Sequence, residues 1–121
     1  MTATTWAAVV LLGGIGALGR FLVDARVAAI AGRAFPLGTL AINLSGSFVL
    51  GILVGATLEG NGYVLAGTAT IGSYTTFSTW MYETQRLTED GQVRGAALNV
   101  GVSLGLGLAA AALGRAIGEL L

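Results

Sequence analysis

The chain has 121 residues, of which 55% are hydrophobic and 10% are charged, and its mean hydropathy is +0.82. An average soluble domain carries about 25% charged residues, so this chain has too few to cover its surface in water, and we expect lipid to be its solvent. Cys and His are absent, which excludes disulfides, thiolate metal sites and imidazole chemistry. The net charge is zero, and no basic stripe indicates nucleic-acid binding.

Apolar stretches recur four times along the chain. A membrane-spanning helix needs roughly 20 mostly apolar residues, and the stretches that meet this requirement are about Ala3–Val23, Leu37–Thr57, Gly62–Tyr82 and Gly95–Ile117. No positive charge precedes Trp6, so we expect the first stretch to be a mature span and not a cleaved signal peptide. The sequence thus predicts an all-α membrane protein with a single four-helix domain over residues 1–121.

The first span contains a glycine pattern, Gly14–Gly19, that matches the G-x-G-x-x-G of dinucleotide-binding folds. Such a site also needs an acidic residue about 20 positions on and a parallel sheet. The region from Arg33 to Leu44 holds no acid, and four spans leave no room for the sheet. We therefore assign these glycines to close packing of the first helix.

Charged and helix-breaking residues gather in the joints between the spans. In the first joint, the partly apolar segment Val27–Phe35 precedes Pro36, and we expect it to form a short interfacial helix. Short loops on the cytoplasmic side carry the excess of Arg. The first and third joints lie on one side and hold most of the arginines, namely Arg26, Arg33, Arg86 and Arg94, with Arg20 at the end of the first span. The other side has only Arg115, which predicts that both termini lie outside.

Glycines four residues apart lie on the second and fourth spans, and they indicate faces where helix backbones approach closely. The pairs are Gly51 with Gly55, Gly101 with Gly105, and Gly114 with Gly118. We expect these faces to pack helix against helix.

Polar residues inside the spans are costly in lipid and usually face a bundle interior or a water-filled path. Asn43 lies within the second span, and seven Ser or Thr fall between Thr68 and Thr79 of the third. Gly72 followed by the β-branched pair Thr75 and Thr76 weakens the helix, so we expect it to break there. Backbone carbonyls freed by a break are good ligands for a hard cation such as Na⁺.

Aromatic residues follow the expected break. Phe77 and Trp80 are three apart and share one face once the helix resumes. The edge of an aromatic ring is electropositive, so it can stabilise a small anion without the tight binding of a full cation. The hydroxyls of Ser78 and Thr79 can donate along the same path. These residues also have purely structural explanations: ordinary aromatic packing for Phe77 and Trp80, and a hydrogen bond between helices for Asn43.

Three segments together resemble the fluoride-channel family known as Fluc or CrcB: GALGR at Gly16–Arg20, PLGTLAINLSGSFVLG at Pro36–Gly51, and GSYTTFSTWMYE at Gly72–Glu83. The resemblance implies a four-helix subunit in an antiparallel dimer with two anion pores. It also implies a structural Na⁺, which is not transported, at the dimer centre on the main-chain carbonyls of Gly72 and Thr75. The implied anion-pore residues are Asn43, Phe77, Ser78, Thr79, Trp80 and Ser103; the implied vestibule or structural polar residues are Arg20 and Glu83.

The chain departs from the pattern of this family at two positions. Trp80 stands where the family has a second phenylalanine, and Asn99 stands, by its spacing from Ser103, where we expect a pore tyrosine. Both departures touch the expected pore and leave the expected Na⁺ positions intact.

The resemblance predicts passive fluoride export across the cell membrane. An antiparallel homodimer needs a subunit that inserts into the membrane in both directions, whereas the Arg bias of this chain favours one direction. Two assemblies are therefore considered: a homodimer and a heterodimer with a paralogous subunit. The alternative function, a small dual-topology exporter of drugs or other cations, needs a carboxylate within the membrane. The first span has none before Asp24, and Glu83 lies at a span end. A third interpretation, a non-transporting scaffold, leaves the polar third span unexplained.

Overall fold

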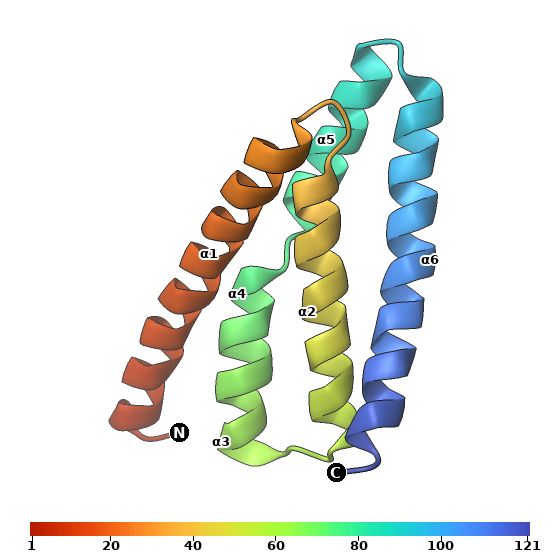
Figure 1. Ribbon diagram of the computed structural model, residues 1–121. Coiled ribbons are helices and arrows are strands. Elements are labelled where there is room, and N and C mark those ends of the chain that lie inside the picture. Colours follow the sequence, from red (N-terminus) through yellow and green to blue (C-terminus); the bar gives the residue numbers. More distant parts are fainter.

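The computed structural model describes residues 1–121 and contains only helices, which run up and down in one bundle (Figure 1). Helix α1 covers Ala3–Ala31, α2 covers Leu37–Gly55 and α6 covers Val93–Gly118. These three are long and apolar enough to cross a membrane. Between α2 and α6 the chain forms α3 (Gly60–Tyr63), η1 (Val64–Ile71), α4 (Gly72–Tyr74) and α5 (Phe77–Glu89), which together make a broken fourth rod. The prediction of four helices with an interrupted third is confirmed, and both termini lie at the same end (Figure 1).

Helix α1 is longer than the sequence predicted. We expected the span to end near Val23 and a separate interfacial helix to follow over Val27–Phe35, and this was wrong, because α1 continues without interruption to Ala31. No Gly or Pro lies between Val23 and Ala31, and the helix ends only at Gly32, which has a φ of 74°. Asp24 stays within the helix and pairs with Arg33 at 3.2 Å.

Helices α2 and α6 pack through glycines, as expected for two of the three predicted pairs. A side chain on Gly51 or Gly55 would overlap the carbonyl oxygens of Ala111 or Arg115 on α6. In the same way, a side chain on Gly114 or Gly118 would overlap the carbonyls of Phe48 or Ile52 on α2. The backbones of α2 and α6 are therefore in contact.

The third glycine pair does not pack within the chain. Gly101 and Gly105 have open space where a Cβ atom would stand. Both residues are exposed on α6. No helix of this chain packs against these two residues, so the prediction of a packing face here is not confirmed within the chain.

The glycines of α1 explain the false dinucleotide motif. A Cβ atom on Gly16 would overlap the carbonyl oxygen of Thr70, and one on Gly13 would lie 3.3 Å from the hydroxyl of Ser73. Gly16 is buried against the broken rod. The expectation of close packing for the first helix is confirmed.

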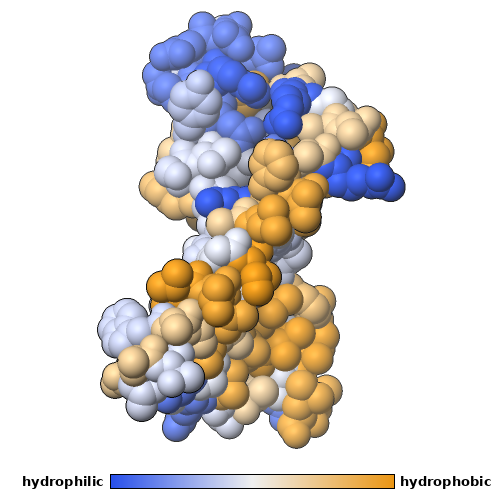
Figure 2. All heavy atoms as spheres, turned by 90° about the vertical axis from the view of Figure 1, so that its left-hand side faces the viewer, coloured by the Kyte–Doolittle hydropathy of each residue, from blue (hydrophilic) through white to orange (hydrophobic).

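Most of the apolar surface of the chain is exposed. Only 16 of 121 residues are buried, while large apolar side chains along α1 and α6, such as Val10, Phe21 and Leu108, are more than half exposed. Figure 2 shows hydrophobic residues over the middle and lower part of the molecule and hydrophilic ones gathered at its upper end. Such a surface fits a protein whose helices face lipid or another chain.

Candidate functional site

The broken rod loses its helical backbone at two residues. Thr75 (φ −76°, ψ 160°) and Thr76 (φ −148°, ψ 120°) are extended, whereas Gly72 (φ −62°, ψ −35°) is still helical. The predicted break is thus confirmed and lies at the C-terminal end of the expected range. The adjacent β-branched threonines explain the break better than Gly72 does.

A π-helical segment, η1, precedes the break, and the sequence did not predict it. In η1 the hydrogen bonds span five residues, as where the Gly72 N–H donates to the Gly67 carbonyl. The hydroxyl of Thr70 also donates to the carbonyl of Leu65, five residues earlier, at 2.8 Å. The Thr75 hydroxyl likewise donates to the Ile71 carbonyl at 3.1 Å, so two of the seven hydroxyls in this region bond back to their own rod.

Asn43 on α2 holds the extended backbone of Thr76. Its amide nitrogen donates to the Thr76 carbonyl, and its amide oxygen accepts the Thr76 N–H, each at 2.9 Å. Both backbone groups of a buried residue thus find partners in a single side chain, which a break within a membrane requires. The Thr76 hydroxyl in turn caps α5 by accepting the Thr79 N–H at 3.2 Å.

The break also frees main-chain oxygens. Because the Thr76 N–H donates to Asn43, the Gly72 carbonyl lacks the backbone donor that a continuous α-helix would supply. The Thr75 carbonyl accepts no backbone hydrogen bond, and its donor is the Arg20 guanidinium at 3.4 Å. The chain has no group of three acidic side chains that could hold a metal ion. These two neutral oxygens are ligands of the kind that a hard monovalent cation accepts.

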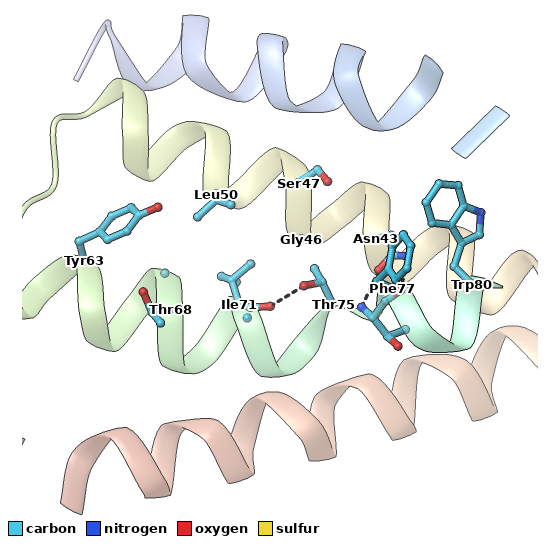
Figure 3. Close-up of a pocket in the computed structure, with 13 residues that line it drawn as sticks. Asn43, Gly46, Ser47, Leu50, Tyr63, Thr68, Ile71, Thr75, Phe77 and Trp80 are labelled. Carbon is cyan, nitrogen blue, oxygen red and sulfur yellow. Dashed lines mark hydrogen bonds between the residues drawn. The ribbon is translucent and has the colours of Figure 1, made fainter. Parts of the chain in front are cut away.

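A groove of about 400 Å³ runs along the break between α2 and the broken rod (Figure 3). Asn43, Thr75, Phe77 and Trp80 contribute to its walls, and no charged side chain does. The rings of Phe77 and Trp80 meet edge to face, with centroids 5.7 Å apart and planes at 82°. Phe77 is 71% exposed, so its ring is accessible from outside the chain.

Gly72 also lines this groove, whereas the remaining predicted site residues lie outside it. Thr79 lines a second hollow of about 340 Å³ together with Arg20, and Ser78 is exposed beside the Thr76 hydroxyl. Glu83 accepts a hydrogen bond from the buried hydroxyl of Thr39. Ser103 is half-buried on α6 and lines neither hollow.

Sequence reasoning missed several residues that shape the groove. Thr76 was read as a helix breaker, yet it is both the residue that Asn43 binds and the N-cap of α5. Its position three residues before Thr79, at the start of a helical run, is a signal that could have identified the cap. Ser47 and Tyr63, which also line the groove, carry no local signal, because only the packing of α2 on η1 brings them to it.

The profile of the family described as "CrcB-like protein, Camphor Resistance (CrcB)" matches residues 7–115. The chain belongs to this family. A protein named "Fluoride-specific ion channel FluC 2" from Mycolicibacterium paratuberculosis is 53% identical over 119 residues, which cover 98% of either chain. Its namesake from Mycobacterium tuberculosis is 52% identical over 99% of this chain and 95% of its own length, and "Fluoride-specific ion channel FluC" from Geobacter sulfurreducens is 44% identical over 85% and 87%. Members of this family are multi-pass membrane channels, not enzymes.

Proposed function

We propose that the chain, as one domain, is a subunit of a fluoride-specific ion channel that exports cytoplasmic fluoride passively. Relatives of the same length carry this activity in their names and share about half of their residues with the chain. The single observation that carries the proposal is the uncharged groove at the break, which combines largely apolar walls with the Asn43 amide beside the exposed Phe77. A membrane anchor would have no use for such a groove.

The groove suits a small anion because it offers weak positive dipoles and no cation. The amide nitrogen of Asn43 has two N–H groups, and Thr76 takes one of them, so the second can donate to an ion. The exposed ring of Phe77 adds an electropositive edge. An ion that leaves its hydration shell here would be held weakly enough to move on.

Passive export is sufficient to protect a cell from fluoride. Fluoride enters as neutral hydrogen fluoride from an acidic medium and ionises in the more neutral cytoplasm, where the anion is trapped. A membrane potential that is negative inside drives the anion outward by about 2.3 kcal/mol per 100 mV. The channel therefore needs no energy source of its own.

A fluoride-selective electrode tests the proposal directly. Liposomes that contain the purified chain are loaded with potassium fluoride, and a potassium ionophore is added to dissipate the opposing potential. We expect rapid fluoride release, no comparable chloride release, and no uptake of cationic drugs. Release of chloride at the same rate, or drug uptake driven by a proton gradient, would contradict the proposal.

We infer in addition that the Gly72 and Thr75 carbonyls of two antiparallel subunits bind a structural Na⁺ at the centre of a dimer. The inference rests on the two carbonyl oxygens that the break frees from the helix. When bound, the ion supplies a positive charge that offsets the converging carbonyl dipoles and joins the subunits. Arg20 keeps its guanidinium beside the Thr75 carbonyl and so fixes the direction of that peptide group.

Exchange of Na⁺ for a larger organic cation tests this inference separately from fluoride flux. We expect the dimer to dissociate at a lower detergent or denaturant concentration without Na⁺, and flux to fall with it. If dimer stability and flux are the same in both media, the structural Na⁺ is contradicted. Fluoride conduction as such would then still stand.

The orientation of the chain can be measured because the sequence contains no cysteine. Asn61→Cys lies in the short helix α3 at the end that holds the termini, and Asp90→Cys lies in the loop at the opposite end; both positions are exposed. We propose that both termini lie outside, so an impermeant thiol reagent added to whole cells should label Asn61→Cys and not Asp90→Cys. If both positions are labelled to about half, the chain inserts in both directions, as a homodimer requires. In a separate experiment, fluoride efflux by the purified chain alone would show that no paralogous subunit is needed.

A further inference from the structure

Trp80 is held to α6 by a closed circuit of hydrogen bonds. Its indole N–H donates to the main-chain carbonyl of Asn99 at 3.0 Å. The Asn99 amide nitrogen donates to the hydroxyl of Thr84 at 2.9 Å, and that hydroxyl donates to the Trp80 carbonyl at 2.8 Å. Both the ring and the backbone of Trp80 are thus tied to one residue of α6.

The circuit lies in a well-packed part of the molecule. Asn99 is 1% exposed, and it shares this region with the buried Leu87 of α5 and Ala96 of α6. A buried amide that loses its partner costs more than the net value of the hydrogen bond. The circuit is therefore expected to stay closed and to allow the indole one orientation.

The orientation decides which part of Trp80 can meet an ion. A free indole N–H would be a good donor for an anion, but here the carbonyl of Asn99 occupies it. The ring carbons remain available at the groove, where Figure 3 shows the indole standing beside Phe77. Trp80 can act on an ion there only through its ring.

We propose that Asn99 and Thr84 are positioning residues that lock Trp80, so that its ring and not its N–H faces the ion path. The inference rests on the proposed fluoride conduction and adds to it a reason why an indole can stand in the groove. The two departures from the family pattern, Trp80 and Asn99, contact each other.

The test uses four variants in a Trp6→Phe background, which leaves Trp80 as the only indole. Asn99→Leu removes the amide at similar volume, and Thr84→Val removes the hydroxyl that links it to Trp80. Trp80→Phe removes the N–H and keeps a ring. Thr88→Val is the matched control, because Thr88 is exposed one turn along α5 and donates only to the Thr84 carbonyl.

Two readouts are combined: near-ultraviolet circular dichroism of Trp80, which reports an immobilised ring, and fluoride flux. Asn99→Leu and Thr84→Val should each reduce the dichroism, and the loss of one hydrogen bond that holds α5 to α6 should lower flux by up to about tenfold. Trp80→Phe serves as the background that lacks the indole N–H, and adding Asn99→Leu to it should change flux by less than about threefold relative to Trp80→Phe alone. Thr88→Val should change neither readout.

Three outcomes would overturn the proposal. The first is an equal loss of flux by Asn99→Leu in the Trp80 and the Trp80→Phe backgrounds, which indicates a purely structural role. The second is unchanged dichroism in both Asn99→Leu and Thr84→Val, and Thr84→Val decides this alone if Asn99→Leu does not fold. The third is abolished flux in Trp80→Phe, which would make the N–H itself essential. If the parent protein shows no fluoride flux, the proposed function is contradicted instead. The dichroism would still decide whether Asn99 and Thr84 hold the Trp80 ring in place.

Discussion

Helix α2 meets its two neighbours in different ways. Toward α6, glycines let the two backbones touch, and every nearby polar group of the main chain stays within its own helix. Toward the broken rod, the side chain of Asn43 takes over the backbone groups of Thr76, and the packing leaves a groove. The contact of α2 with α6 thus supports the fold, whereas the contact of α2 with the broken rod exposes polar atoms inside the membrane.

The difference between the two contacts of α2 shows how a small chain can fold stably with a break in one of its helices. Breaking a helix in lipid leaves donors and acceptors that must be satisfied by the protein. Here one amide satisfies two of them, while the α2–α6 contact keeps α2 in place. Variants on the two sides of α2 should therefore fail in different ways: loss of the folded bundle on one side, and loss of conduction on the other.

The largest effect is expected on the α6 side. In Gly114→Ala the new methyl group would overlap the Phe48 carbonyl, which belongs to the backbone and cannot move aside easily. Overpacking of this kind costs about 1–3 kcal/mol and sometimes more, so the variant should unfold at a clearly lower denaturant concentration. Gly105→Ala on the same helix, where space is open, is the control; equal loss in both would show that a second chain covers Gly105.

The next effect is expected at the amide that bridges the break. Asn43→Asp replaces the donor to the Thr76 carbonyl by a carboxylate oxygen and places a negative charge on the proposed anion path. We expect fluoride flux to fall at least about tenfold, since leaving a buried acceptor unsatisfied costs about 1–3 kcal/mol before any repulsion of the ion. Asn61→Asp at an exposed position of helix α3 is the control, and equal flux in both variants would remove Asn43 from the path.

A smaller effect is expected at the exposed ring. Phe77→Ile removes the electropositive ring edge, and because the side chain is 71% exposed it should reduce flux several-fold with little change in unfolding. Leu108→Ala, at a side chain that is 72% exposed on α6, should change neither quantity. Unchanged flux in Phe77→Ile would assign the ring to packing between subunits.

The smallest effect is expected at Thr75, whose backbone and not its side chain serves the proposed cation site. Thr75→Ser keeps the hydroxyl that donates to the Ile71 carbonyl at 3.1 Å, so flux and Na⁺ dependence should stay within about twofold. The lost methyl group lies against Gly46, and Gly46→Ala should therefore be tolerated better together with Thr75→Ser than alone. A large loss of Na⁺ dependence in Thr75→Ser would assign the cation to the side chain.

Much of the fold follows from local patterns in the sequence. Long apolar runs fix the number of spans, and the adjacent Thr75 and Thr76 weaken the helix wherever it packs. The end of α1 was predicted too early because the charge of Asp24 was read as a boundary, although a charge near the membrane surface can pair with Arg33 while the helix continues. Gly32, and not the charge of Asp24, ended the helix.

The sequence by itself determined that this is a four-helix membrane protein with a polar, broken third helix, because hydropathy and backbone preference act over a few neighbouring residues. The tertiary structure decided what each polar group binds. Asn43 bridges Thr76, the indole of Trp80 is tied to Asn99, and Gly101 faces open space while Gly114 faces a backbone. These contacts join residues far apart in the chain, and they depend on the rotation of each helix about its axis, which no local pattern specifies.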